Sequence, residues 1–225
     1  MNYIEKINII KFLSEPKRTP FAPEWLYFLG ETFILNIDFK KIEKFLLKKE
    51  KEILKLPQTT RDNKSIDGYT GLGPNSTTAR FDQYNILSFN NSEIKKLKKA
   101  IIEMHNKFLQ DLKIEKPKSL FAQCWVNIMR KGQQIKLHIH GTSPDCYLGG
   151  HICIKCNNTA THYINPQNQI NEPSTFRSPN KVGKITLFQN CIPHYTDIHI
   201  SDEERITIAF DLNIINLTKN QIQLY

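Results

Sequence analysis

The spacing of apolar positions along the chain is helical before about residue 111 and strand-like after residue 119. Asp38 starts a helical pattern whose apolar side consists of Phe39, Ile42, Leu46 and Ile53. Ser92 can cap a second helix that runs from about residue 93 to residue 111. The apolar stripe of this second helix consists of Ile94, Leu97, Ile101, Met104 and Phe108. We therefore expect two amphipathic helices that pack against the structure formed by the second half of the chain.

The second half contains short runs rich in β-branched and aromatic residues, with turn signals between them. These runs cover residues 120–132, 134–140, 148–156, 161–166, 184–188 and 205–215. No helical pattern separates the runs, which favours an antiparallel sandwich or barrel. The chain is predicted to be an α+β protein, with helices first and then a β-sandwich of roughly eight strands.

The two halves are expected to form one domain. Its N-terminal helical and loop region would cover residues 1–118, and its β core would cover residues 119–225. Residues 1–36 read as a proline-containing lead-in, and residues 67–81, DGYTGLGPNSTTARF, read as a loop. This loop lacks the Gly-Lys-Ser/Thr of a phosphate-binding loop, so a lid or substrate loop is the functional alternative.

Composition is typical of a globular protein, with 40% hydrophobic and 24% charged residues among 225. The sequence has no apolar run of membrane-spanning length and no recognisable secretory signal. The odd number of cysteines, five, favours reduced thiols. We expect a cytoplasmic protein, in the host cytoplasm if the source is viral.

The net charge of +9 allows an anionic partner such as nucleic acid. Much of the positive charge lies on the two predicted helices, where a solvated helix face explains it better. A nucleic-acid partner is therefore not favoured, although charge alone does not exclude it.

Three histidines are the first candidate for chemistry. His138 and His140 are two residues apart in a predicted strand, so their side chains point to the same face. His194 follows another predicted strand, and the fold would have to bring it to the pair. A solvated strand face would explain the pair alone, whereas all three together would form a mononuclear metal site.

Arg205 strengthens the metal interpretation. It begins a strand that is otherwise apolar apart from Thr207, and a guanidinium that points into a barrel requires an anionic partner. A guanidinium binds a carboxylate in a two-pronged way, and Thr207 on the same face can add a hydroxyl. The simpler alternative is a solvated arginine at the strand end, paired with Glu203 or Glu204.

The order of His-x-His, a distal histidine and Arg-x-Thr resembles the 2-oxoglutarate- and iron(II)-dependent oxygenases, which have a double-stranded β-helix (a jelly-roll or cupin-like barrel). WVNIMRKGQQIKLHIH and GKITLFQNCIPHYTD followed by RITIAFDL resemble an uncharacterised phage and bacterial branch of that superfamily. HGTSPDCYLGGH, residues 140–151, has the spacing of a segment in aspartyl/asparaginyl β-hydroxylases. The resemblance covers about Phe121 to Leu212.

The resemblance implies a role for each matched residue. His140 and His194 would bind iron, Arg205 and Thr207 would hold the distal carboxylate of 2-oxoglutarate, and His151 and Asn127 would contact its other end. His138 departs from the usual His-x-Asp/Glu pattern. The third ligand could be His138 or Asp145, and we favour the set His138, His140 and His194.

The resemblance implies a hydroxylase that uses Fe(II), the cosubstrate 2-oxoglutarate and, as a further cofactor, ascorbate. A peptide or protein side chain is the first candidate substrate and a free amino acid the second, with nucleic-acid bases third. One rival hypothesis is a cupin-like metalloenzyme that does not use 2-oxoglutarate. Another is a basic binding module that has no enzymatic activity.

Overall fold

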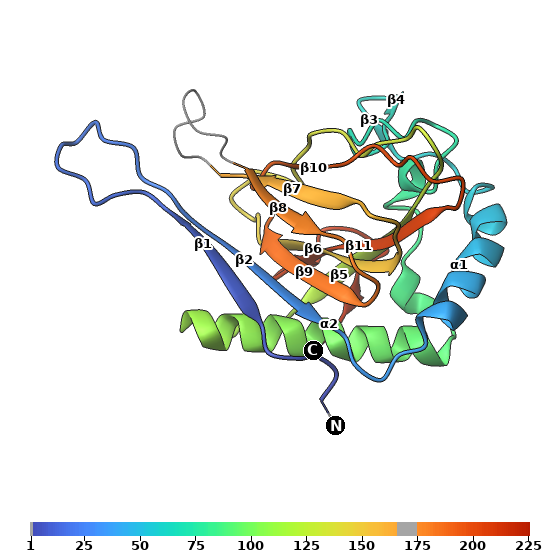
Figure 1. Cartoon of the computed structure of the whole chain (residues 1–225), viewed down its shortest axis with the longest axis horizontal. Helices are drawn as coiled ribbons and strands as arrows, with labels where there is room; N and C mark the ends of the chain where they lie inside the picture. The colour runs from blue at the N-terminus through green and yellow to red at the C-terminus, as the bar shows by residue number, and fades with distance from the viewer. Residues whose placement is uncertain (1, 166–174) are drawn as a thin grey trace.

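The computed structural model describes residues 2–165 and 175–225. In this part of the chain, seven strands form a large sheet in the order β1-β2-β9-β6-β11-β5-β12. Three strands form a smaller sheet in the order β10-β7-β8, and a short hairpin pairs β3 with β4. Figure 1 shows helix α2 running beneath the large sheet, with α1 at one side.

The bounds of the elements follow in chain order. They are β1 (Asn8–Leu13), β2 (Leu26–Phe33), α1 (Phe39–Ile53), β3 (Thr60–Arg61), β4 (Lys64–Ser65), α2 (Ser92–Leu112), β5 (Phe121–Met129), β6 (Leu148–Lys155), β7 (Ala160–Ile164), β8 (Thr175–Pro179), β9 (Lys184–Gln189), β10 (His194–Thr196), β11 (Arg205–Asn213) and β12 (Ile222–Gln223). Two short 3₁₀ helices, Thr78–Arg80 and Ile86–Ser88, lie between β4 and α2. The end of the predicted strand at residue 166 lies outside the described residues.

The large sheet has one apolar and one polar face, because side chains alternate along each strand. The β11 residues that join the core under the helices are Ile206, Ile208, Phe210 and Leu212. The β11 side chains that point to the opposite face are those of Arg205, Thr207, Ala209 and Asp211. The helices therefore cover the apolar face, as expected for an α+β protein, and the polar face is left for the candidate site.

The two sheets form a sandwich rather than a closed barrel. β10 pairs with β7 and β7 with β8, but no described strand of the smaller sheet pairs with one of the large sheet. A cluster of Glu31 (β2), Lys184 (β9) and Ser178 (β8) joins the sheets: Lys184 Nζ lies 3.1 Å from Glu31 and 2.5 Å from Ser178 Oγ. Burial of Lys184 is tolerable because its charge is paired in this way.

Both predicted helices are present, and local hydrogen bonds explain where they begin. Asp38 caps α1 as predicted, since its side chain accepts a hydrogen bond from the Lys41 amide. The cap of α2 is Asn91 rather than Ser92, because the Asn91 side chain accepts from the amides of Glu93 and Ile94. The predicted start was therefore wrong by one residue.

Residues 1–36 were predicted as a lead-in without strands, and this prediction was wrong. The segment contains β1 and β2, which form the edge of the large sheet, and β2 pairs with β9. The prolines lie in the long connection between these strands, which extends away from the sandwich (Figure 1). Within the described residues, no helix is long and apolar enough to cross a membrane.

Helix α2 contacts the large sheet at a glycine. Phe108 is 1% exposed, and its ring lies where a side chain at Gly30 would be: a Cβ there would come 2.8 Å from Phe108 Cδ2. The absence of a side chain on β2 therefore lets the helix approach the sheet closely.

Phe108→Ala is expected to lower the free energy of unfolding by about 3–5 kcal/mol, because it removes an aromatic ring and leaves a cavity under the sheet. Lys95→Ala on the exposed side of α2 is the matched control and should change it by less than about 0.5 kcal/mol. Urea denaturation followed by circular dichroism measures both. Equal effects of the two substitutions would contradict the packing described here.

Candidate metal centre

Backbone hydrogen bonds bring the three histidines together. The amide of His138 donates to the carbonyl of His194 (3.1 Å), and the amide of His194 donates to the carbonyl of His138 (3.0 Å). The His140 amide donates to the Asn190 carbonyl at 3.0 Å. The segment 134–140 was predicted as a strand. It is instead an extended segment with a single bridge to β10, at His138.

The imidazole rings of the three histidines form a compact cluster. Ring centroids lie 4.3 Å apart for His138 and His194, 5.1 Å for His140 and His194, and 5.5 Å for His138 and His140. One potential ligand atom from each ring lies within 4.8 Å of the other two. These spacings suit a single ion held at one face, with the opposite face left for other ligands.

Hydrogen bonds define which nitrogen of each ring is free. The Nδ1 atoms of His138 and His194 lie 2.8 and 3.0 Å from the carbonyl oxygens of Lys136 and Ile192. His140 Nδ1 lies 2.5 Å from a carboxylate oxygen of Asp211. Carbonyls and ionised carboxylates only accept, so each Nδ1 carries the proton and donates it. Each Nε2 then keeps a lone pair, as a metal ligand requires.

Burial favours the neutral form of His138 and His194. It lowers the pKa of His194 well below its ordinary value, with the neighbouring histidines adding to the effect. Burial and then His140 lower the pKa of His138 to about 4. Neutral rings can bind a cation without first losing a proton, so the chemistry of this donor set fits a divalent transition metal.

Arg205 lies in a narrow inner cavity of about 40 Å³ that it shares with all three histidines. Its side chain is 1% exposed. One guanidinium nitrogen contacts Met129 Sδ at 3.1 Å, and Nε has no hydrogen-bond partner. Within residues 2–165 and 175–225, no carboxylate forms an ion pair with this guanidinium. A buried cation of this kind requires an anion, so the charge in this cavity suits a carboxylate group.

The other residues expected to contact 2-oxoglutarate line the same cavity. Asn127 lies directly opposite Thr207 across the β5–β11 pair, and its side-chain oxygen accepts from Thr78. His151 on β6 contacts Tyr163 through Nδ1 at 3.3 Å, and its buried Nε2 has no partner. Burial, followed by the charge of Arg205, lowers the pKa of His151 to about 3. The cavity therefore presents unused polar atoms beside the cation.

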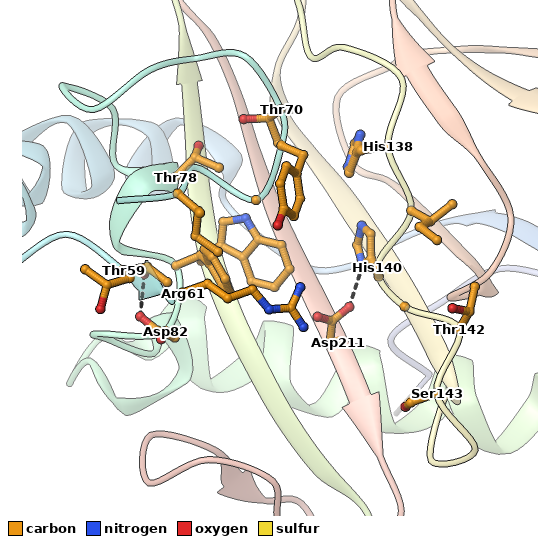
Figure 2. Close-up of a pocket in the computed structure, with 18 residues that line it drawn as sticks. Thr59, Arg61, Thr70, Thr78, Asp82, His138, His140, Thr142, Ser143 and Asp211 are labelled. Carbon is orange, nitrogen blue, oxygen red and sulfur yellow. Dashed lines mark hydrogen bonds and ion pairs between the residues drawn. The ribbon is translucent and has the colours of Figure 1, made fainter. Parts of the chain in front are cut away.

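A larger cleft of about 860 Å³ opens on the other side of the histidines. The two spaces share Thr70, Trp125, His138 and His140. Figure 2 shows Arg61 and Asp82 on one side of the cleft and Thr142 and Ser143 on the other. The glycine-rich loop 67–81 supplies part of the cleft wall on the side of Arg61 and Asp82, and its role as a lid or substrate loop stays a prediction.

Several weaker candidates lie outside the cluster. Asp145 is exposed and is not among the residues whose donor atoms gather there. Thr142 is exposed at the rim of the cleft. His199 is buried, but its Nε2 contacts the carbonyl of Glu203 at 2.5 Å. The donor atoms that gather in the described part of the chain are those of the three histidines, and Asp145 is not among them.

Sequence reasoning missed Asp211 and its contact with His140. A signal was present, because residues 205, 207, 209 and 211 point to one face of a strand. The same alternation that places Arg205 and Thr207 on one face continues through residue 209 to Asp211. Extending it by two steps would have placed a carboxylate on the face that carries the site.

Residues 123–211 match the family model described as "Putative 2OG-Fe(II) oxygenase". The matched segment contains the three clustered histidines and Arg205. This segment is therefore similar to the 2-oxoglutarate- and iron(II)-dependent oxygenases, whose members use Fe(II) and 2-oxoglutarate. The similarity to a phage and bacterial branch and the use of ascorbate stay predictions.

Solved structures support the same fold. A prolyl hydroxylase from Trichoplax adhaerens, in complex with a peptide fragment of the hypoxia-inducible factor oxygen degradation domain, aligns with a TM-score of 0.55 at 12% identity, over 92% of this chain and 83% of that chain. AviO1 from Streptomyces viridochromogenes aligns with a TM-score of 0.52 at 10% identity, over 84% and 90%. The predicted double-stranded β-helix is confirmed in this open, sandwich form.

Coverage of one further relative is lower. A 2OG-Fe(II) oxygenase family member from Burkholderia pseudomallei aligns at 13% identity with a TM-score of 0.43, over 57% of this chain and 62% of that chain. The chain thus spans less than two thirds of that relative. A comparison with curated protein sequences gave no match.

Replacing His138, His140 or His194 by alanine should weaken Fe(II) or Co(II) binding by more than about 100-fold, since each change removes a ligand rather than an outer partner. His162→Ala is the matched control, because His162 pairs with Asp197 at 2.7 Å outside the cluster. Anaerobic titration with Co(II), followed by absorption spectroscopy, measures the affinities. Wild-type affinity in all three variants would contradict the assignment of a metal centre to these histidines.

Proposed function

We propose that this protein is a 2-oxoglutarate-dependent hydroxylase that acts on peptide or protein side chains. In this proposal His138, His140 and His194 hold Fe(II), and Arg205 with Thr207 binds the distal carboxylate of 2-oxoglutarate. Asn127 and His151 contact the other end of the cosubstrate. These assignments rest on the geometry of the chain's own residues.

The buried guanidinium of Arg205 is the observation that carries the proposal. A cation that is 1% exposed, without a carboxylate partner in the described part of the chain, costs free energy until an anion arrives. The three histidines lie in the same cavity, so one dianion could contact Arg205 at one end and the metal at the other. 2-Oxoglutarate has this chemistry, with a carboxylate at each end.

The protein residues would perform three tasks. Iron with 2-oxoglutarate and oxygen supplies the oxidation, which is coupled to decarboxylation of 2-oxoglutarate to succinate. Arg205 and Thr207 orient the cosubstrate, and the imidazoles fix the ion at the boundary between the inner cavity and the cleft. Trp125 and Phe188 exclude water around the imidazoles, since their rings lie 5.8 and 5.4 Å from the His140 ring.

The size and lining of the cleft support a peptide over a free amino acid. Its volume of about 860 Å³ lies toward the upper end of the range of about 300–1,000 Å³ for ligand pockets. Side-chain hydroxyls, one arginine and two aspartates line it, together with Trp125 and Phe81. This mixture suits the backbone amides and mixed side chains of an extended segment. The Trichoplax prolyl hydroxylase in complex with a peptide fragment is consistent with this choice.

A cupin-like metalloenzyme without 2-oxoglutarate is the second candidate. The three-histidine donor set favours it, because that set departs from the His-x-Asp/Glu pattern. It gives no reason for a buried Arg205 that lacks a carboxylate partner among the described residues, however, so the first candidate accounts for more of the structure.

Arg205→Ala should weaken 2-oxoglutarate binding by about 30-fold or more, because truncating one partner of a buried charge pair costs about 2–5 kcal/mol. Binding is measured by calorimetry on protein loaded with Mn(II) in the absence of oxygen. Arg130→Ala is the control, since Arg130 is exposed and pairs with Glu50 on α1. Unchanged binding in Arg205→Ala would refute the role of Arg205. A wild-type protein that binds metal but not 2-oxoglutarate would favour the cupin-like alternative.

Peptides should stimulate succinate formation from 2-oxoglutarate more than free amino acids do, and Tyr69→Ala should raise the KM for such a peptide without changing that for 2-oxoglutarate. Tyr69 lines the cleft but not the inner cavity. Phe21→Ala, at a 97% exposed residue on the long β1–β2 connection, serves as control. Stimulation by free amino acids alone would contradict the peptide assignment.

A further inference from the structure

Asp211 contacts the candidate metal centre without being one of its ligands. It lies on β11, and its Oδ1 is 2.5 Å from His140 Nδ1 (Figure 2). We infer that Asp211 is a positioning residue that holds His140 in the Nδ1-protonated form, with Nε2 directed at the metal. The inference rests on the proposed function, because His140 is a metal ligand only there.

His140 differs from the other two histidines in how its ring is held. His138 and His194 each donate to a carbonyl two residues earlier in the chain, so these partners move with the histidine. The partner of His140 is a side chain 71 residues away, on the central part of the large sheet. The orientation of the His140 ring therefore depends on Asp211 rather than on its own local backbone.

A glycine makes this contact sterically feasible. Gly149 on β6 lies opposite Asp211 in the β6–β11 register. A Cβ at Gly149 would come 2.8 Å from His140 Nδ1 and 2.6 Å from Asn190 Oδ1, closer than real Cβ contacts allow. The His140 ring consequently occupies space that any other residue at position 149 would take.

The contact also supplies a missing charge. Three neutral imidazoles leave a divalent ion uncompensated by the protein, unlike a set of two histidines and a carboxylate. An ionised carboxylate behind an imidazole increases the basicity of the ligating nitrogen and fixes its tautomer. Asp211 would thus provide a carboxylate from outside the ligand set.

The first test uses the metal-free, full-length protein. Long-range ¹H–¹⁵N spectra of histidine-labelled protein report which ring nitrogen carries the proton. His140 is expected to be protonated at Nδ1 in the wild type and to lose this preference in Asp211→Leu, while Asp211→Asn largely keeps it because the amide oxygen still accepts. A His140 protonated at Nε2 in the wild type would overturn the inference.

The second test measures Co(II) affinity in the same proteins. Asp211→Leu should weaken binding by about 10–100-fold, and Asp211→Asn by less. Asp197→Asn, which alters a histidine–aspartate pair outside the cluster, should leave the affinity unchanged. Unchanged affinity in a folded Asp211→Leu would overturn the inference.

Gly149→Ala provides a variant that keeps Asp211 itself. It should displace the His140 ring and lower Co(II) affinity even if Asp211→Leu fails to fold, and unchanged affinity would again count against the inference. Failure of the proposed function has a different signature. In that case the wild type would bind no Co(II), while the spectra of the metal-free protein would still report whether Asp211 sets the tautomer of His140.

Discussion

The reciprocal pair of backbone hydrogen bonds between His138 and His194 is the constraint on which the rest of the site depends. It joins an extended segment that follows β5 to strand β10 of the smaller sheet. Together with the hydrogen bonds from the His140 amide to Asn190 and from the Thr196 amide to Ile135, it fixes the distance between the two histidine-bearing segments. Because it is formed by the backbone, many side chains could occupy these positions without changing the path of the chain. The path of the backbone therefore does not require histidine at these positions, and the imidazoles are explained by the chemistry of the site.

The large sheet separates two kinds of packing. Its apolar face and the helices form the hydrophobic core, where burial of side chains such as Leu97 and Ile208 stabilises the fold. Its other face carries Arg205, Thr207 and His151, whose burial is costly unless ligands or partners satisfy them. Stability from one face thus supports reactive groups on the other. Strand β11 contributes to both, since alternate residues point in opposite directions.

Much of this arrangement was predictable from local patterns. Helical and strand periods predicted α1, α2 and the main strands, and the spacing of His138, His140, His194 and Arg205 predicted the candidate site. The predictions failed where distant segments decide the outcome. Strands β1 and β2 lie in a stretch that was interpreted as a lead-in. They are strands because β2 pairs with the distant strand β9 and β1 pairs with β2, and a local sequence pattern does not reveal such long-range pairing. The contact between Asp211 and His140 depends on a glycine on a third strand, which no short motif reveals.

The location of the histidines on two different layers has a consequence for the stability of the whole molecule. His194 belongs to the smaller sheet, while His140 is bonded through Asp211 to the large one. An ion bound by both would bridge the sheets, and it would bind the folded chain in preference to the unfolded one. By mass action the folded state would then gain about 2.7 kcal/mol when free metal is 100 times its dissociation constant. The concentration of free metal would then determine the stability of the folded protein as well as its activity.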